Sequence, residues 1–238
     1  MYAWGDKEVD ASSLHVFKRL IKKRASDYPI AYLLGNQGFW SLDLKVTEDV
    51  LIPRPETELL VETALEKIQA IKAPKILDLG TGSGAIALAI AVERSDAIIL
   101  ASDYSDKALI VAAENAQLNN INNVSFIQSN WFESIDPHPF DLIVSNPPYI
   151  SLNDPHLNQS IRHEPFQALA SGKTGLDDIR LILQQAPNYM KNSAWILIEH
   201  GYDQGDIVPE IMSQTGLLQT CCIKDYNENN RLSIGKKG

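Results

Sequence analysis

Short apolar segments alternate with amphipathic segments along most of this chain. From Pro74 onward, continuous apolar runs predict buried strands, and apolar residues at helical spacing predict the helices between them. This alternation is typical of a mostly parallel α/β sheet that helices cover on both faces. The final two strands have no helix between them, so we expect a seven-stranded sheet with one antiparallel strand. The expected strands are residues 75–79, 97–102, 124–128, 140–145, 194–199, 218–223 and 231–234, and the expected helices are 85–93, 105–119, 176–190 and 204–215.

The N-terminal part of the chain follows a different pattern. Residues 12–25 are predicted to form an amphipathic helix that Ser12 or Ser13 caps and that ends at Tyr28-Pro29. The apolar face of this helix carries Leu14, Phe17, Leu20 and Ile21.

A hairpin and a linker helix are expected next. Alternating apolar and polar positions over 37–52 predict the hairpin, and a helix is expected from Thr57 to about Ile71. We therefore divide the chain into a small helical region at 1–35, a hairpin and linker helix at 36–72, and the main α/β domain at 73–238.

The composition is that of an ordinary globular protein with an acidic balance. The chain has 21 basic and 30 acidic residues, which gives a formal net charge of −9. Proteins that bind duplexes usually carry a basic face, so this balance argues against stable binding to free nucleic acid. A local basic cluster is either the solvated face of the first helix or a docking face for an acidic partner; it consists of Lys18, Arg19, Lys22, Lys23 and Arg24.

The sequence also indicates where the protein works. No apolar run reaches the length of a membrane span, and the N-terminus lacks the basic-then-apolar pattern of a signal peptide. The adjacent Cys221 and Cys222 are expected to be unbridged strand residues in a reducing compartment. We therefore expect a cytoplasmic protein without a membrane partner or a metal site.

The segment from Ile76 to Gly84 leads from a strand into a helix through a glycine-rich loop. Glycines let the chain turn tightly and let a ligand approach the backbone, and ligands of such sheets bind at the carboxyl ends of the strands. A dinucleotide fingerprint would place Ala85 at its third glycine position, which that fingerprint tolerates. The closer spacing G-x-G-x-G after an acid instead resembles the S-adenosylmethionine loop of Rossmann-like methyltransferases. The expected cofactor residues here are Asp78, Gly80, Thr81, Gly82, Ser83 and Gly84.

Three further residues follow the next strands and are expected around the same cofactor. Asp103 ends a strand and is expected to accept hydrogen bonds from ribose hydroxyls; the alternative is a helix cap. Asn130 stands where methyltransferases of this kind commonly have Asp, and its amide oxygen can accept the same bond from the adenine amino group. Trp131 either stacks near the adenine or belongs to the core. Asp78, for its part, either holds the loop or reaches the methionine amino group through water.

The tetrapeptide Asn146-Pro147-Pro148-Tyr149 leaves the carboxyl end of the strand at 140–145 and carries the strongest chemical signal. Methyl transfer from a sulfonium to a nitrogen is an in-line displacement, so positioning dominates. Acceptors on both N–H bonds of an amide would orient it and favour the charge that develops. Asn146 offers a side-chain oxygen and Pro147 a backbone carbonyl. The prolines stiffen the loop, and Tyr149 offers a planar face to a planar amide or base. We expect all four residues at the catalytic and substrate-binding site.

The fifth strand of the pattern closes with Glu199-His200-Gly201. A charged residue at this edge lies on the functional side of the sheet. We prefer a loop salt bridge for Glu199 over a catalytic role.

Taken together, these motifs resemble the HemK-like family of release factor glutamine N5-methyltransferases. The resemblance extends from about Pro29 to the last strands and includes the specific segment Leu51–Glu58 as well as the tetrapeptide. The other segments that carry it are Pro29–Gly35, Phe39–Leu42, Asp78–Ala91, Asp154–Leu157, Leu197–Gly201 and Arg231.

The resemblance implies a Rossmann-like, S-adenosylmethionine-dependent enzyme that methylates the glutamine of the Gly-Gly-Gln motif in class I peptide chain release factors. It implies that Asn146 and Pro147 bind the glutamine amide, that Asn146 also borders the cofactor, and that Arg54 and Pro55 form a wall of the pocket. We expect S-adenosylhomocysteine as the second product and a monomeric enzyme. The family carries an N-terminal helical domain for substrate docking, of which residues 1–35 resemble a shortened remnant.

Three rival interpretations remain open at this point. An adenine N6-methyltransferase acting on DNA or RNA would use the same tetrapeptide, although the acidic charge counts against it. A nicotinamide-dependent oxidoreductase would need an acid, base or metal arrangement for hydride transfer that the sequence does not display. A non-catalytic protein with the same fold would bind the cofactor without turnover.

Overall fold

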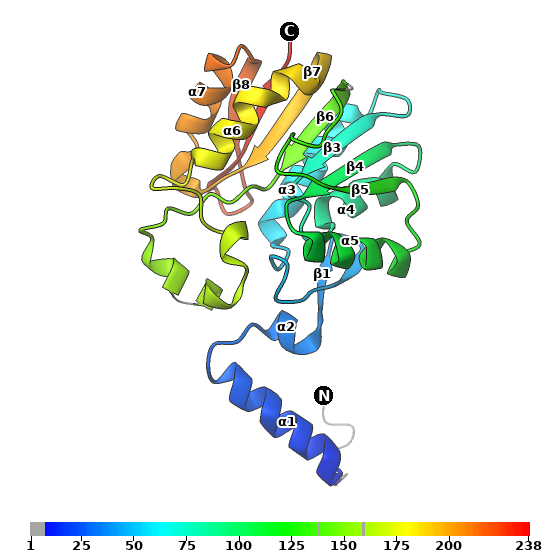
Figure 1. Ribbon diagram of the computed structural model, residues 1–238, viewed down its shortest axis with the longest axis vertical. Coiled ribbons are helices and arrows are strands. Elements are labelled where there is room, and N and C mark those ends of the chain that lie inside the picture. Colours follow the sequence, from blue (N-terminus) through cyan, green and yellow to red (C-terminus); the bar gives the residue numbers. More distant parts are fainter. Residues whose placement is uncertain (1–7, 138, 159) are drawn as a thin grey trace.

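The computed structural model describes residues 8–137, 139–158 and 160–238, so the first seven residues of the expected N-terminal region lie outside it. Within these residues, seven strands form one sheet in the order β5-β4-β3-β6-β7-β9-β8 (Figure 1). Parallel pairing joins β5, β4, β3, β6 and β7, whereas β9 runs antiparallel to both β7 and β8. The expected mostly parallel sheet with an antiparallel strand is confirmed. The strands are β3 (Lys75–Leu79), β4 (Ile98–Asp103), β5 (Val124–Gln128), β6 (Phe140–Ser145), β7 (Met190–Glu199), β8 (Leu218–Lys224) and β9 (Asn230–Lys236).

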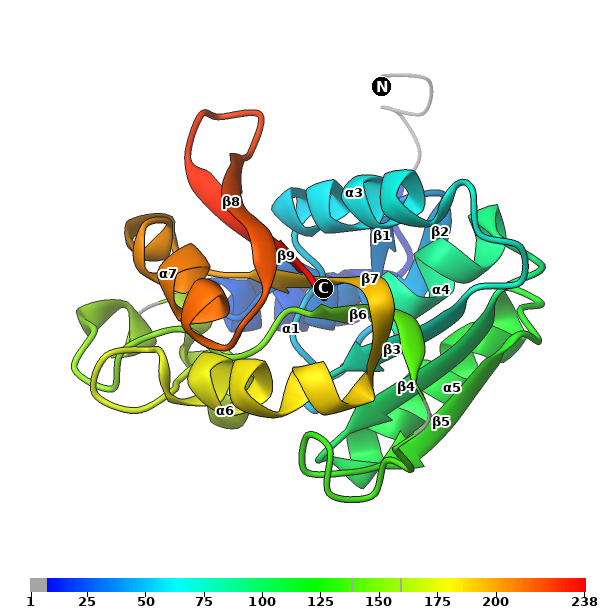
Figure 2. The same ribbon diagram turned by 90° about the horizontal axis from the view of Figure 1, so that it is seen from above.

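Helices cover both faces of the sheet and enclose two separate cores (Figure 2). On one face lie α3 (Glu58–Ile68), α4 (Ala85–Glu93) and α5 (Asp106–Leu118), and on the other lie α6 (Asp177–Gln185) and α7 (Ile207–Gln214). Alternate residues of each strand point to opposite faces, so Ile76 joins the first core and Leu77 the second. This arrangement buries the central strands on both faces, and every residue of β6 is buried, whereas the edge strands β5 and β8 contain no buried residue.

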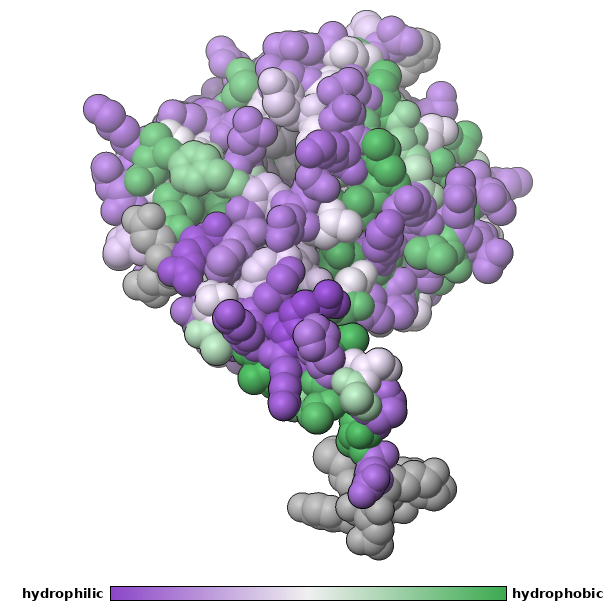
Figure 3. Space-filling model, turned by 60° about the horizontal axis from the view of Figure 1, so that its bottom comes forward, coloured by the Kyte–Doolittle hydropathy of each residue, from purple (hydrophilic) through white to green (hydrophobic). Residues whose placement is uncertain are grey.

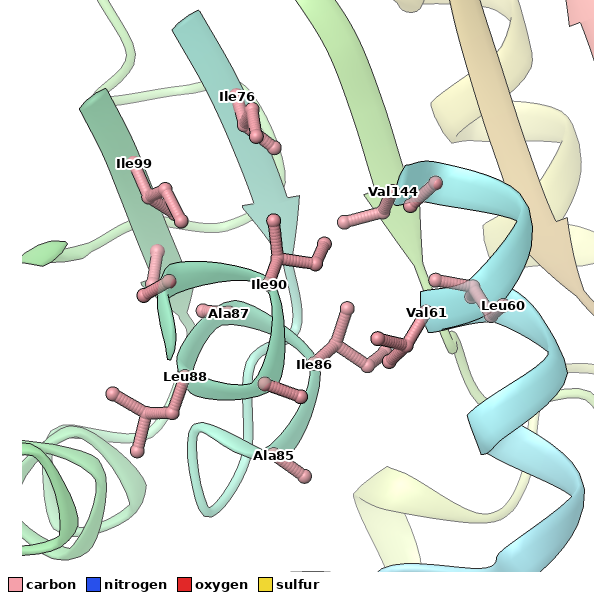
Figure 4. Packing of buried hydrophobic residues seen from close by; sticks show 14 of the residues in the cluster. Leu60, Val61, Ile76, Ala85, Ile86, Ala87, Leu88, Ile90, Ile99 and Val144 are labelled. Atoms are coloured by element: carbon pink, nitrogen blue, oxygen red, sulfur yellow. The ribbon is translucent and has the colours of Figure 1, made fainter. Parts of the chain in front are cut away.

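The helix α4 is apolar around its whole circumference. Every residue from Ala85 to Ala91 is buried. In Figure 4, Ile86 on α4 points toward Val61 on α3, and Ile90 points toward Ile76 on β3. A helix enclosed by a sheet and a second helix needs no polar face.

Two expected helices are shorter than predicted, and each adjoins a 3-10 turn. The helix predicted at 176–190 ends at Gln185 and continues as a 3-10 turn at Ala186–Tyr189, since Pro187 cannot donate the backbone hydrogen bond of an α-helix. Strand β7 then begins at Met190 rather than at 194. The helix predicted at 204–215 begins at Ile207, after a separate 3-10 turn at Tyr202–Gln204.

The hairpin of β1 (Asn36–Phe39) and β2 (Leu42–Lys45) pairs antiparallel and is shorter than the predicted 37–52. Buried Asn115 on α5 fastens it to the main domain. Its side-chain oxygen accepts from the Lys45 N–H at 2.7 Å, and its amide donates to the carbonyls of Lys45 and Ser83 at 3.0 and 2.9 Å. One side chain therefore joins the hairpin to the glycine loop.

The first helix, α1 (Ala11–Arg24), projects from the body and connects to it through the short helix α2 (Ile30–Leu34) (Figure 1). None of the residues Ala11–Arg24 is buried, and Phe17 is 58% exposed. Figure 3 shows apolar and polar side chains side by side on this projection. The cap prediction was wrong: Asp10 caps the helix, because its carboxylate accepts from the N–H groups of Ser12 and Ser13.

Among the described helices, none combines the length and the apolar character that a bilayer crossing demands.

Candidate active site

The strand order reverses between β3 and β6, so a ligand crevice is expected at their carboxyl ends. Leu79 pairs with Ser145 in the parallel register, and the Ser145 hydroxyl donates to the Leu79 carbonyl at 2.7 Å. The residues that follow, Gly80 and Asn146, therefore leave the sheet side by side. A cavity of about 500 Å³ opens here. Of the predicted residues, its lining includes Arg54, Gly80, Thr81, Gly82, Ser83, Asp103, Asn130, Trp131, Asn146 and Pro148.

The glycine loop takes a conformation that its glycines permit. Gly80, Gly82 and Gly84 have φ values of +73°, +56° and +86°, in the left-handed region that side chains disfavour. A Cβ on Gly84 would lie 3.0 Å from the Leu88 side chain, so this position also needs a small residue for packing. Gly84 stands under the loop as the N-terminal cap of α4 and does not line the cavity.

Buried Asp78 supports the loop from below rather than lining the cavity. The Thr81 hydroxyl donates to its Oδ2 at 2.6 Å, and Oδ1 has no hydrogen-bond partner in the described part of the chain. Burial raises the pKa of Asp78 to about 7, against the Thr81 hydrogen bond, and the nearby Asp103 raises it further. Of the two predicted roles for Asp78, this geometry corresponds to holding the loop.

Asp103 lines the cavity and ties the loop to the next strand. Its Oδ2 accepts from the Gly82 N–H at 2.8 Å and its Oδ1 accepts from the Ser105 N–H at 2.9 Å. The cap of α5 is Ser105, whose hydroxyl accepts from the Ala108 N–H. A carboxylate has about four acceptor sites, so Asp103 keeps capacity for a ligand hydroxyl. Burial raises its pKa.

Trp131 belongs in part to the core, as one of its two predicted alternatives has it, and it also borders the cavity. It is half-buried and packs against the second core. Its ring lies over the glycine loop, 3.5 Å from where a Cβ on Gly80 would be, and its Nε1 donates to Asp178 at 3.1 Å. The neighbouring Asn130 donates its amide to Glu133 at 2.8 Å, which leaves the amide oxygen as an acceptor beside the cavity.

The tetrapeptide is divided between the cavity and the core. Asn146 and Pro148 line the cavity, whereas Pro147 is buried and Tyr149 packs against the second core. The Tyr149 carbonyl accepts from the Gln204 side chain at 3.1 Å, and burial raises the pKa of the Tyr149 hydroxyl. This anchoring fixes the path of the loop, so that Asn146 is held at the cavity wall.

Arg54 also lines the cavity, and a contact that no motif predicted holds its side chain. Buried Glu164 binds the Arg54 guanidinium and also accepts from the Ile52 N–H at 3.0 Å. Pro55 is exposed and opens a 3-10 turn, η1 (Pro55–Thr57), outside the cavity lining. Glu164 and Asp178 were both missed, because each acts through a partner more than forty residues away in sequence.

The preferred interpretation of Glu199 was wrong. Within the described residues Glu199 forms no salt bridge, and Arg231, whose charge acts on it, pairs with Asp225 at 3.4 Å. Glu199 is 2% exposed, and its Oε2 lacks a hydrogen-bond partner there. Burial raises the pKa of Glu199 to about 7, while hydrogen bonding by Thr57 and the charge of Arg231 act in the opposite direction. The site therefore contains a second buried acid.

Comparisons with known proteins agree with this geometry. Residues 55–176 match the family model of the methyltransferase small domain, and residues 1–35 match that of the PrmC N-terminal domain. The release factor glutamine methyltransferase of Xylella fastidiosa is 44% identical, with 99% of this chain and 86% of that protein covered.

Solved structures share the fold at low sequence identity. The catalytic domain of hMettl16, solved with an RNA hairpin, has a TM-score of 0.66 at 15% identity and covers 98% of this chain and 94% of that one. The Thermus thermophilus 16S rRNA N2 G1207 methyltransferase, solved with AdoMet and guanosine, has a TM-score of 0.59 at 15% identity and covers 85% and 50%.

The sheet order, the glycine loop and the cavity at the switch point define a Rossmann-like methyltransferase of the S-adenosylmethionine-dependent class. Within that class, the chain belongs to the release factor glutamine methyltransferase family.

Proposed function

We propose that this protein transfers a methyl group from S-adenosylmethionine to the side-chain amide nitrogen, N5, of the glutamine in the Gly-Gly-Gln motif of class I peptide chain release factors. The observation that carries the proposal is the cavity that joins the glycine loop to Asn146, in a chain 44% identical to a relative named for this activity. The product from the cofactor would be S-adenosylhomocysteine.

The residues around the cavity fit S-adenosylmethionine. Asp103 offers carboxylate oxygens for ribose hydroxyls, and Asn130 offers an amide oxygen for the adenine amino group. Gly80 and Gly82 bring bare backbone to the cavity wall, and Trp131 supplies an aromatic surface beside them. Thr81 and Ser83 complete this side, and Asp78 and Gly84 shape the loop beneath it. Bound there, the cofactor supplies an electrophilic methyl group on a sulfonium.

The chain's own residues would orient the acceptor nitrogen. A glutamine amide is a weak nucleophile because its lone pair is delocalised, so rate enhancement rests on position and on stabilising the charge that develops. The Asn146 side-chain oxygen and the Pro147 carbonyl would accept the two amide hydrogens. Pro148 and Tyr149 hold the loop that carries these acceptors, and Arg54 supplies part of the cavity wall. The proton leaves after transfer, when the nitrogen carries positive charge.

The decisive experiment measures transfer of labelled methyl from S-adenosylmethionine to a purified unmodified release factor. A factor with Gly-Gly-Asn in place of Gly-Gly-Gln and a DNA fragment are the controls. Label on the factor that disappears in the Asn control is the expected result. Label on DNA alone would replace the proposal with the adenine N6-methyltransferase interpretation, and cofactor binding without label on any acceptor would overturn it as well.

A further inference from the structure

The carboxamide of Asn146 has two chemically different ends, and the proposed function needs one of them at the cavity. An oxygen there can accept a hydrogen bond from the N–H group of the substrate amide. An NH₂ group there could not, because both groups would then be donors. The two ends have nearly the same shape, so packing alone does not choose between them. Hydrogen-bond partners on the far side of the carboxamide must therefore set its orientation.

The first partner is Thr57, immediately before α3. Thr57 is buried, and its hydroxyl accepts from Asn146 Nδ2 at 3.3 Å, across 89 residues of sequence. A hydroxyl has one hydrogen to give and can accept as well. If that hydrogen went to Asn146, the carboxamide oxygen would be turned toward Thr57 and would be occupied there, so that it could not accept from a substrate amide. The direction of the Thr57 hydroxyl therefore decides which end of Asn146 faces the substrate.

The second partner is Glu199, which ends β7 beside the tetrapeptide. Ser145 on β6 pairs with Ile198 on β7, so the next residues along the two strands, Asn146 and Glu199, leave the sheet together. The side chains of Thr57 and Asn146 lower the pKa of the Glu199 carboxyl group, which means that they favour its charged form. A carboxylate only accepts, so a charged Glu199 would take the single hydroxyl hydrogen of Thr57.

We propose that Glu199 and Thr57 are positioning residues that lock the Asn146 carboxamide with its oxygen toward the cavity. Glu199 takes the Thr57 hydrogen, Thr57 can then only accept from the Asn146 NH₂ group, and Oδ1 is left to face the acceptor nitrogen of the substrate. This inference rests on the proposed function. It explains why a buried acid stands behind an uncharged binding residue.

The other charged groups around Glu199 leave it able to play this part. Arg231 on β9 favours the carboxylate, but its guanidinium is occupied by Asp225 and by the His200 carbonyl. Glu56 in η1 disfavours the charge, and the buried Tyr149 hydroxyl lies close enough for its own pKa to rise. Of these effects on the pKa of Glu199, burial is the largest, and it raises the pKa. A protonated Glu199 would hold a hydrogen of its own, and the direction of the chain of hydrogen bonds would no longer be fixed.

The first test replaces Thr57 by Val, which keeps the shape and removes the hydroxyl. The expected result is a fall in kcat of about tenfold to a hundredfold, with the affinity for S-adenosylmethionine changed less than about threefold. Thr57→Ser should restore most of the lost kcat, because it restores the hydroxyl. Thr63→Val is the matched control, since Thr63 is a buried threonine within α3 and the hydrogen bond of Asn146 goes to Thr57 instead.

The second test uses pH at saturating cofactor and release factor. The kcat of the unsubstituted enzyme should rise as pH increases through about 7. In Glu199→Gln this rise should disappear and kcat should be lower at pH 8. Calorimetric binding of S-adenosylmethionine verifies that each variant is folded.

The outcomes separate the two proposals. An inactive unsubstituted enzyme would overturn the proposed function. An active one in which Thr57→Val behaves like Thr63→Val, or in which Thr57→Ser is no better than Thr57→Val, would overturn the positioning role alone. So would a loss that lies entirely in cofactor affinity, or a pH profile that Glu199→Gln leaves unchanged.

Discussion

Two buried acids stand behind the two ends of the cavity, and they are alike in almost every local property. Asp78 on β3 lies under the glycine loop, and Glu199 on β7 lies behind Asn146. Each has one oxygen without a hydrogen-bond partner among the described residues, and burial raises the pKa of each to about 7. Each also interacts with a threonine hydroxyl, Thr81 or Thr57.

The acids differ in how far their partners lie along the chain. Asp78 binds Thr81, three residues onward, so it shapes a single loop. Glu199 interacts with Thr57 and Asn146, which come from the linker and from β6, so it joins three segments. A buried carboxyl group beside a threonine hydroxyl therefore orders a single loop at one end of the cavity. At the other end, the same kind of pair lies between segments that are far apart in the sequence. We expect damage at Asp78 to appear in cofactor affinity and damage near Glu199 to appear in turnover.

The largest expected effect is that of Asn146→Ala, which tests whether turnover and cofactor affinity depend on different ends of the cavity. Loss of one preorganised hydrogen-bond group at a reacting centre typically costs about 10²–10³ in kcat, and we expect a loss of that size here. Calorimetric affinity for S-adenosylmethionine should change far less than kcat. A variant that loses cofactor affinity and turnover in equal proportion would show that the two ends of the cavity are not separable.

At the other end, Asp78→Ala should act on the cofactor. Removing the acceptor leaves the buried Thr81 hydroxyl without its 2.6 Å partner, and the loss of such a charge-assisted bond costs about 1.5–3 kcal/mol. We therefore expect the dissociation constant of S-adenosylmethionine to rise about tenfold to a hundredfold, with kcat at saturation within about threefold. The opposite pattern, intact affinity with slow turnover, would contradict the assignment.

The dependence of folding stability on pH tests whether the two acids behave alike. A native pKa of about 7, above the ordinary value, means that the folded state holds the proton more tightly than the unfolded state. The stability contributed in this way is complete below the ordinary pKa and is lost as pH rises through about 7. Glu199→Gln removes this loss, so its Tm relative to the unsubstituted protein should be about 5 °C more favourable at pH 8 than at pH 5. Asp78→Asn should behave in the same direction, and equal Tm differences at both pH values would refute the shared cause.

The smallest expected effect concerns Trp131, which borders the Asp78 end. Trp131→Phe keeps an aromatic surface over Gly80 and removes the donor to Asp178. One hydrogen bond of about 1 kcal/mol corresponds to a rise of about fivefold in the dissociation constant of S-adenosylmethionine, with kcat unaffected. Isothermal titration would measure it. A larger loss in kcat than in affinity would show that Trp131 acts on turnover, as we expect for the residues near Glu199.

The same contrast explains what the sequence could predict. Periodicity identified the sheet because its central strands are mostly apolar, and Asp78–Gly84 was recognisable because the loop and its supporting acid are neighbours. Asp103 and Asn146 could be predicted to line the cavity because they stand at the carboxyl ends of strands. The salt bridge expected for Glu199 is absent among the described residues, and the burial of its carboxyl group leaves no spacing signal in the sequence. Glu164 was missed because its partner Arg54 lies 110 residues away.

Helix ends were less predictable than strands. Asp10 competes with Ser12 and Ser13 for the cap of α1, and all three are good capping residues, so only geometry decides among them. The end of α6 depended on Pro187, which a periodic apolar pattern does not register.

The position of β9 has a consequence for the order in which the protein is made. The strands β3 to β6, with the glycine loop and Asn146, are all synthesised before residue 150. Strand β7, however, pairs with its second neighbour, β9, only after residues 230–236 have been synthesised. The 2.7 Å contact between buried His200 and Ser233 also forms only then. A nascent chain stalled before residue 230 would expose an unpaired edge of β7 and leave β8 without its partner, which is a template for aggregation. Completion of this sheet therefore depends on translation proceeding through its late strand.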